Sequence, residues 1–237
     1  MIHFVGAGSG AVDLITVRGQ KLLEEADIVV YAGSLVNPEL LTVCQKDCQI
    51  YNSAKMTLEE VTEVMISGEK QGKKVVRLHT GDPCLYGAIR EQMDHLDELG
   101  IAYDSCPGVS SFCGAAAALN LEYTLPEVSQ SVIITRTEGR TPVPEREKIM
   151  SFAAHGATMV LFLSTGLLEK LVKELLAGGY ASDTPAAIVY KATWPEEEAY
   201  VCTIDTLVET ARKHQITKTA LILVGNVVTH SHYERSK

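Results

Sequence analysis

Apolar runs of strand length alternate with amphipathic helical segments along the whole chain. This regular alternation favours an α/β fold. The first half contains five predicted strands, at residues 3–5, 28–31, 49–51, 75–78 and 102–105. The second half contains five more, at residues 131–135, 158–163, 186–190, 199–203 and 220–225.

Helical periodicity fills the intervals between the predicted strands. Thr57 followed by Glu60 forms a capping box, which predicts that a helix starts there. Leu58, Val61 and Met65 then fall on one face of that helix. The other predicted helices are the segment that carries Ile89, Met93 and Leu96, the small-residue stretch 110–119, and residues 145–154, 167–177 and 206–213.

The segment 119–130 shows neither the helical nor the strand pattern of apolar residues and is interpreted as a linker. It separates an N-terminal α/β lobe, residues 1–118, from a C-terminal α/β lobe, residues 131–237. We therefore expect two αβα lobes. A crevice between two lobes is a favoured ligand site, so we expect a ligand cleft between them.

Composition narrows the range of partners. The formal net charge of −9 argues against nucleic acid, because phosphate binding needs a basic surface. A small anionic substrate is still compatible with this charge, since a local cationic cluster can outweigh the global sign. No apolar run reaches membrane-spanning length, and the first residues do not resemble a signal peptide. We therefore expect a cytoplasmic protein with no membrane partner.

The cysteines and histidines predict no metal site. The six cysteines include no CxxC pair, and Cys44 and Cys48, which would share a face on a helix, have no further ligands nearby in the sequence. His230 and His232 form an HxH near the C-terminus, but two ligands in a tail are weak support for a metal. Reduced, partly buried thiols are the simpler interpretation.

A polar turn follows the predicted strand 75–78. Residues 80–86, here called the GDP loop, contain Gly81, Asp82 and Pro83 and come where a parallel sheet presents ligands, at the carboxyl end of a strand. Gly81 permits a backbone geometry or a close approach that a Cβ would block. Asp82 can cap a following helix, face a ligand, or do both.

A first glycine loop, residues 6–10, follows the first strand. Its sequence GAGSG, followed by Ala11, nearly matches the dinucleotide fingerprint GxGxxG. The acidic residue expected at the end of the second strand is missing, because Tyr31 and Ala32 stand there. A nicotinamide-dependent oxidoreductase is therefore an alternative rather than the main interpretation.

Two further loops follow strands and carry polar chemistry. The PG loop, residues 107–111, can offer backbone N–H groups at a helix start, or Ser110 and Ser111 can simply cap that helix. The arginine loop, residues 135–142, carries Arg136 and Arg140, whose forked guanidinium groups suit carboxylate recognition, although surface arginines are often only solvated. The loop 191–195 adds a cation, Lys191, and the only tryptophan, Trp194, which serves either in packing or as an aromatic wall for a flat ligand.

Together these loops resemble the tetrapyrrole methylase family. VGAGSGAVDLITVRG matches the first signature of the family, with Ser9 where proline is usual. VVRLHTGDPCLYG matches the start of the second signature, whose later PG is Pro107-Gly108, preceded by Ser105 where an apolar residue is more typical. The resemblance extends through ALILVG at residues 220–225 and covers essentially the whole chain.

The resemblance implies two αβα lobes of the class III methyltransferase type, S-adenosylmethionine as the methyl donor, and a homodimer. Position by position, it implies cofactor contacts by Gly81, Asp82, Pro83, Leu85, Tyr86, Ser110, Ser111, Leu163, Tyr190, Thr219 and Ala220. The substrate carries many carboxylates while the protein is acidic, so a local positive field is needed. The candidates are Arg136 and Arg140, followed by Lys191 and Arg18.

Within the family, YAGSLV, TRTEGRTPVPERE and VYKATWPEE resemble the enzymes that methylate carbon 11 of precorrin-4, with or without cobalt. Methylation of another precorrin carbon or of uroporphyrinogen III is the alternative inside the family. The methyl sulfonium is already activated, so positioning can supply much of the rate. The sequence identifies no general base.

Overall fold

The protein is described here from a computed structural model, which covers residues 1–229 of the 237. The chain divides into two compact units, Met1–Cys113 and Gly114–Lys237. Helix α4 (Ser111–Ala118) spans the division, and residues 119–130 contain neither helix nor strand. Within the described residues, no helix is both long and apolar enough to cross a membrane.

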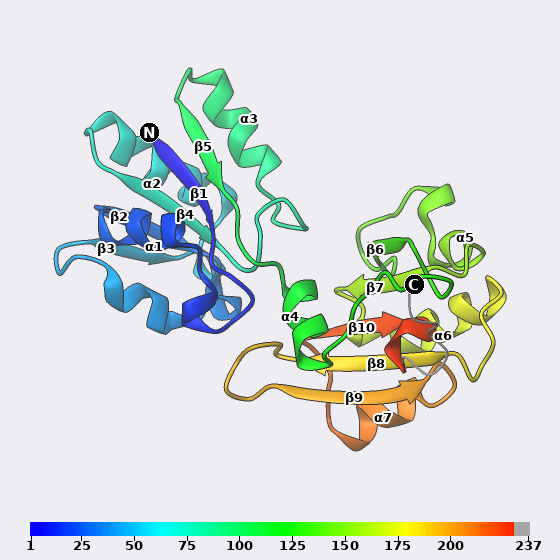
Figure 1. Ribbon diagram of the computed structural model, residues 1–237. Helices are drawn as coiled ribbons and strands as arrows, with labels where there is room; N and C mark the ends of the chain where they lie inside the picture. The colour runs from blue at the N-terminus through cyan, green and yellow to red at the C-terminus, as the bar shows by residue number, and fades with distance from the viewer. Residues whose placement is uncertain (230–237) are drawn as a thin grey trace. The chain divides into compact units, whose positions relative to one another are not determined.

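The first unit is built on a five-stranded parallel sheet with the strand order β3-β2-β4-β1-β5 (Figure 1). Its strands are β1 (Ile2–Gly6), β2 (Ile28–Tyr31), β3 (Gln49–Asn52), β4 (Val75–His79) and β5 (Tyr103–Cys106). Its helices are α1 (Val17–Glu24), α2 (Leu58–Lys70) and α3 (Arg90–Glu98), with 3₁₀ turns η1 (Val12–Leu14), η2 (Gly33–Leu35), η3 (Pro38–Val43) and η4 (Ser53–Lys55).

Apolar residues cover both faces of this first sheet. Val5, Val29 and Val76 pack on one face with α1 and η3. Phe4 and Val30, which alternate with them, pack on the other face with α2 and α3. The two-residue period of the strands thus gives a three-layer unit, in which both faces are covered and the loops at the strand ends are left to carry chemistry.

The second unit is built on a mixed five-stranded sheet with the order β6-β7-β10-β8-β9. β6 and β7 are parallel, while β10 runs antiparallel to β7 and β8. Its strands are β6 (Val132–Arg136), β7 (Thr158–Phe162), β8 (Pro185–Tyr190), β9 (Glu198–Thr203) and β10 (Ala220–Val224). Its helices are α5 (Ile149–Ala153), α6 (Leu168–Ala177) and α7 (Leu207–Lys213), with 3₁₀ turns η5 (Glu145–Glu147), η6 (Thr165–Leu167) and η7 (Asn226–Val228).

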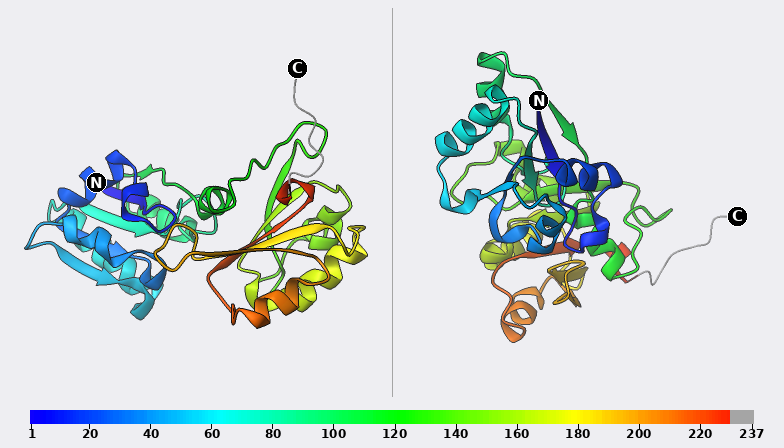
Figure 2. Two further views of the ribbon diagram at one scale, coloured as in Figure 1. Left: turned by 60° about the horizontal axis from the view of Figure 1, so that its bottom comes forward. Right: turned by 90° about the vertical axis from the view of Figure 1, so that its left-hand side faces the viewer.

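Helices α5, α6 and α7 pack on one face of the second sheet. Leu171 and Leu175 of α6 and Leu207 of α7 join Met159 and Ile188 of the sheet in one buried cluster. Both views of this unit show α6 and α7 on the same side of the strands (Figures 1 and 2). This packing fixes the strands and hence the loops at their ends.

All ten predicted strands are confirmed, with each end within one residue of its predicted position. The capping box is also confirmed, because Thr57 and Glu60 exchange the two expected hydrogen bonds. The continuous helix over residues 145–154 is wrong. Lys148 has extended backbone between η5 and α5, and its carbonyl starts the second helix anew by accepting from Ser151 and Phe152.

Candidate functional site

Three loops of the first unit meet at the carboxyl edge of its sheet. The strand order β4-β1-β5 makes the GDP loop, the first glycine loop and the PG loop neighbours. Gly8 and Gly81 pair through their backbones, with N···O distances of 2.8 Å and 3.3 Å in the two directions. The GDP loop and the first glycine loop are therefore joined through their main chains.

Glycine is required where these loops touch. A Cβ on Gly108 would lie 2.2 Å from the carbonyl oxygen of Gly81 and 2.7 Å from Cα of Gly6. A Cβ on Gly6 would lie 2.5 Å from Cα of Gly108. The neighbours are backbone atoms that cannot rotate away, so the three loops fit together only when Gly6 and Gly108 have no side chain.

Asp82 connects two of the loops. Its Oδ2 accepts a hydrogen bond from the Gly108 N–H at 2.9 Å, and its Oδ1 accepts one from the Cys84 N–H at 2.8 Å. Partial burial acts to raise the pKa of the Asp82 carboxyl, but the hydrogen bonds from Cys84 and Gly108 outweigh it and lower the pKa below its ordinary value. The carboxylate is therefore ionised at neutral pH and holds the PG loop against the GDP loop.

The expectation that Asp82 caps the next helix is wrong. Residues 82–89 form turns and irregular chain, and α3 begins only at Arg90, after the αR cap residue Ile89. Instead, Asp82 Oδ1 accepts a hydrogen bond from the N–H of Cys84, two residues further on, and so forms an Asx turn.

The other predicted residues of the first unit lie around the same edge. Tyr86 is 43% exposed and has a left-handed backbone with φ 55°. Ser110 is buried directly before α4, and Ser111 is its first residue. Arg18 is exposed in the first turn of α1. Pro83 is buried and Leu85 half-buried in the GDP loop.

Two polar residues that the sequence analysis did not single out also shape this edge. Asn37 is buried, and its side-chain amide donates to the Gly10 carbonyl at 2.9 Å, which holds the first glycine loop. His79, the last residue of β4, is buried next to the GDP loop, and its Nε2 has no partner within residues 1–229. Burial, helped by the positive charge of Arg77, lowers the pKa of His79 to about 3.

The predicted residues of the second unit meet at one edge of its sheet. Ala220 pairs with Tyr190, and the register of β10 with β7 brings Ala220 beside the end of β7, where Leu163 follows. Thr219 accepts from the Lys191 N–H at 3.0 Å, so the loops after β8 and before β10 are joined. The structure thus brings together residues that the resemblance selected from three strand ends.

The arginine loop leaves the neighbouring strand β6 at the same edge. The Arg136 guanidinium donates to the Thr141 and Pro142 carbonyls at 3.2 Å and 3.1 Å. The Thr137 N–H donates to Ser164 Oγ at 2.9 Å, which links this loop to the residue after Leu163. Ser164 was missed in the sequence, although a serine directly after a strand signals such a link.

Lys191 already has local partners. Its Nζ lies 3.5 Å from Glu196 Oε2 and 5.4 Å from the centroid of the Trp194 ring. At this distance Lys191 makes a cation–π contact with Trp194.

Left-handed backbone occurs at several of the predicted positions. Of the non-glycine residues that the structure describes, nine have positive φ. Four of them are predicted site residues: Tyr86, Leu163, Lys191 and Thr219. Left-handed backbone is costly for such side chains and is retained where the surroundings fix it, often at ligand sites. Leu163 is in addition 67% exposed, which is unusual for a leucine directly after a buried strand.

Metal-ligating residues do not cluster in the described part of the chain, where no group of three or more His, Cys, Asp or Glu could hold an ion. Cys44 follows η3 and Cys48 lies in a turn, so the two do not share a helix face. Burial raises the pKa of both thiols, to about 12 for Cys48. His230 and His232 lie outside the described residues.

Comparisons with known proteins show which family the chain resembles. A family model of tetrapyrrole (corrin/porphyrin) methylases matches residues 1–208. A cobalt-precorrin-4 C(11)-methyltransferase of Methanocaldococcus jannaschii is 54% identical over 236 residues, which is 100% of this chain and 91% of that protein. A precorrin-4 C(11)-methyltransferase of Pseudomonas aeruginosa is 43% identical, over 96% of this chain and 90% of that protein.

Solved structures give the same result. The X-ray structure of a cobalamin biosynthetic enzyme, cobalt precorrin-4 methyltransferase, matches with a TM-score of 0.93 and 46% identity, covering 96% of this chain and 95% of that one. Uroporphyrin-III C-methyltransferase from Thermus thermophilus, complexed with S-adenyl homocysteine, matches with a TM-score of 0.82 and 26% identity, covering 96% of this chain and 98% of that one.

Proposed function

Because the chain belongs to the tetrapyrrole (corrin/porphyrin) methylase family, we propose that it transfers a methyl group from S-adenosylmethionine to carbon 11 of precorrin-4, in its cobalt-containing or cobalt-free form. This step belongs to cobalamin biosynthesis. The observation that carries the proposal is full-length similarity to enzymes that bear this activity in their names. The relative with the higher identity bears the cobalt form in its name, which favours cobalt-precorrin-4.

The strand-end loops of the first unit support a methyl-donor site. S-adenosylmethionine offers amide-like, hydroxyl and charged groups that backbone N–H and C=O groups can bind, and supplies an electrophilic methyl on sulfur. Gly6 and Gly108 let the main chains of three loops approach closely at this edge, and the ionised Asp82 fixes its shape. These features fit the donor and support the proposed contacts of Gly81, Asp82 and Ser110 with it.

The chain's own contribution to the reaction is positioning. The methyl group is already activated on sulfur, so transfer requires that the accepting carbon lies close to it and in line with the S–CH₃ bond. Holding the two reactants in this geometry can lower the activation barrier by roughly 7–11 kcal/mol in favourable cases. Tyr86, Leu163 and Thr219 have left-handed backbone, which is often found at ligand sites, and suit this role. Angular methylation makes a quaternary carbon, so no proton leaves that carbon.

The edge of the second unit supports recognition of a polyanionic tetrapyrrole. Arg136, Arg140 and Lys191 gather cations on one sheet edge of a chain whose net charge is −9. Arg18 adds a cation at the edge of the first sheet. Local positive charge of this kind attracts carboxylates in spite of the global sign.

Incubation with S-adenosylmethionine carrying a ¹³C methyl group tests the proposal. Purified cobalt-precorrin-4, precorrin-4 and uroporphyrinogen III are supplied in parallel, and the labelled carbon is located by NMR and mass spectrometry. We expect one methyl at carbon 11 of a precorrin-4 form. Labelling of uroporphyrinogen III instead would support the alternative within the family. The nicotinamide-dependent alternative is set aside, because the family that the chain belongs to transfers methyl groups.

The setting of the enzyme is part of the proposal. We infer that it acts in the cytoplasm and that it assembles as a homodimer, as the family resemblance implies. Sedimentation velocity of the purified chain tests the assembly, and a mass near twice 25.7 kDa is expected.

A further inference from the structure

This inference deepens the proposed function and rests on it. We propose that the two arginines of the arginine loop have different roles. Arg136 is a positioning residue that folds the loop, and Arg140 is the residue that binds a carboxylate of the tetrapyrrole. The sequence alone treats the two as equivalent, whereas their surroundings in the structure differ.

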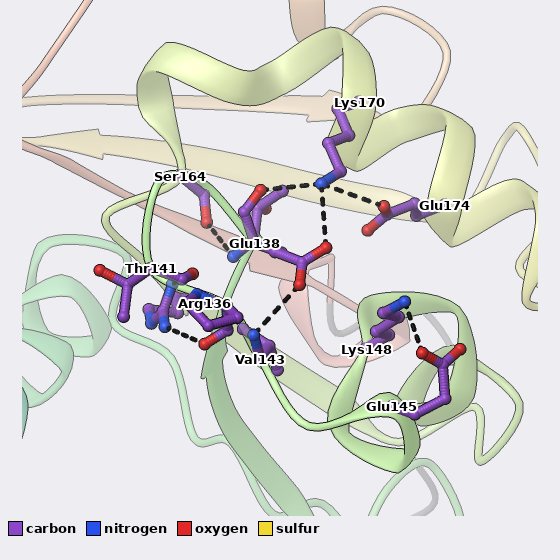
Figure 3. A network of polar contacts seen from close by, with 11 residues as sticks. Arg136, Glu138, Thr141, Val143, Glu145, Lys148, Ser164, Lys170 and Glu174 are labelled. Atoms are coloured by element: carbon purple, nitrogen blue, oxygen red, sulfur yellow. Dashed lines mark hydrogen bonds and ion pairs between the residues drawn. The ribbon is translucent and has the colours of Figure 1, made fainter.

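Arg136 is occupied by its own loop. It is the last residue of β6 and is half-buried, and its two Nη atoms donate to the carbonyls of Thr141 and Pro142. Figure 3 shows the guanidinium directed at the returning end of the loop. A planar fork with two parallel donors is well suited to hold two successive carbonyls, and a lysine could not reproduce it. Arg136 thus closes the loop at its base.

A second anchor fixes the loop to α6. Glu138 Oε1 accepts from the Val143 N–H at 3.1 Å, and Lys170 Nζ donates to the Glu138 carbonyl at 2.8 Å. Lys170 also lies 3.7 Å from the carboxylates of Glu138 and Glu174 (Figure 3). The Val143 hydrogen bond lowers the pKa of Glu138 against a smaller raising effect of burial, and Lys148 and Lys170 lower it further.

Arg140 lies between these anchors. It is exposed, and within residues 1–229 its side chain has no hydrogen-bond or ion-pair partner. All of its guanidinium donors are therefore available to an incoming carboxylate, which a guanidinium can bind in a bidentate manner. Gly139 before it is also exposed, and a Cβ there would meet nothing closer than 3.5 Å. The loop is thus a hydrogen-bonded frame around one available cation.

A double-mutant cycle separates this proposal from two independent substrate ligands. The variants are Arg136→Ala, Arg140→Ala and the double variant, assayed for KM and kcat of the tetrapyrrole at saturating S-adenosylmethionine. We expect Arg140→Ala to raise KM about tenfold to a hundredfold, as loss of a charge-assisted hydrogen bond does. Arg136→Ala is expected to raise KM as well, with kcat within about twofold of the wild type.

The decisive comparison is the double variant. If Arg136 acts only by placing Arg140, the double variant is no worse than Arg140→Ala alone, because there is no arginine left to place. If instead the KM increases of the two single variants multiply in the double variant, the division of roles is overturned. Arg146→Ala removes an exposed arginine from the adjacent η5 and is the matched control, for which KM is expected to stay within about twofold of the wild type.

Conservative replacements give a second signature. Arg140→Lys keeps the charge and is expected to recover part of the affinity. Arg136→Lys loses the fork and is expected to behave like Arg136→Ala. Recovery by Arg136→Lys but not by Arg140→Lys would reverse the assignment.

Limited trypsin digestion tests the frame without substrate. Cleavage after Arg140 is followed by mass spectrometry, with cleavage after Arg146 as internal reference. We expect Arg136→Ala to accelerate the first cleavage at least severalfold, because an unanchored loop opens more often. An unchanged rate would contradict the positioning role. If the wild type shows no methyl transfer while this acceleration is seen, the proposed function fails and the loop frame stands.

Discussion

The two sheet edges that carry the predicted residues are built in different ways. At the edge of the first unit, three loops touch through main chain, and Gly6 and Gly108 leave no room for a Cβ where they meet. At the edge of the second unit, the arginine loop is fastened by the side chains of Arg136, Glu138 and Lys170. The first edge is fixed by close approach of backbones together with the Asp82 bridge, and the second by replaceable polar contacts alone.

This difference matches the two tasks in the proposed reaction. A methyl donor is the same molecule in every member of a methylase family, so a rigid backbone surface can serve all of them. The tetrapyrrole differs between members, and side-chain anchors can change without disturbing the sheet. The comparison predicts that the first edge tolerates almost no substitution, whereas the second edge can be altered in graded steps.

The largest effect is expected from Gly108→Ala. Its Cβ would lie 2.2 Å from the Gly81 carbonyl oxygen, so the PG loop must move, and forced overpacking of this kind costs about 1–3 kcal/mol or more. We expect a lower thermal unfolding temperature and loss of most S-adenosylhomocysteine binding in calorimetry. Gly139→Ala is the matched control in the second unit, where a Cβ meets only Leu167 Cδ1 at 3.5 Å. Equal tolerance of both substitutions would remove the contrast between the edges.

A smaller effect is expected from acid acting on His79. Burial, together with the charge of Arg77, lowers its pKa to about 3, so the folded protein keeps it neutral while the unfolded chain protonates it below about pH 6.5. At neutral pH the histidine is neutral in both states, so it does not oppose folding. As the pH falls from about 6.5 toward 3, the free energy of unfolding decreases by up to about 1.4 kcal/mol per pH unit.

Urea denaturation across this pH range measures the effect. We expect His79→Gln to have a shallower loss of unfolding free energy with falling pH than the wild type. His155→Gln, which removes an exposed histidine from the second unit, should follow the wild type. Parallel curves for His79→Gln and the wild type would show that His79 is not held neutral.

The smallest effect is expected at Glu138. Hydrogen bonding from the Val143 N–H, with the nearby lysines, lowers the pKa of the Glu138 carboxyl below its ordinary 4.5. The contribution of the ionised carboxylate to the loop is therefore present above about pH 4.5 and is lost as the pH falls through the lower folded value. The NMR shift of the Val143 amide proton should titrate with a midpoint below 4.5 and stop titrating in Glu138→Gln. A midpoint at or above 4.5 would contradict this anchor.

Much of the fold could be predicted from the sequence because its strands are short apolar runs with clear ends. All ten were located, and the capping box at Thr57 was found, since these signals are local. The break at Lys148 was not found, because an extended residue between two helical turns leaves the apolar spacing almost unchanged.

The site could be predicted only in part. Strand-end glycines marked the loops, but nothing local showed that Asp82 would bridge to Gly108, 26 residues away, instead of capping a helix. In the same way, two similar arginines four residues apart gave no sign that Arg136 bonds its own loop while Arg140 does not. Long-range backbone partners decide these roles, and a sequence pattern does not contain them.

Paired calorimetry on Asp82→Asn and Arg140→Ala tests the central claim most directly, that the edge of the first unit holds the methyl donor and the arginine loop holds the tetrapyrrole. Asp82→Asn removes the carboxylate that accepts from Gly108, so S-adenosylhomocysteine affinity should fall at least tenfold with tetrapyrrole affinity nearly unchanged. Arg140→Ala should show the opposite pattern. Equal weakening of both ligands in either variant would contradict the account.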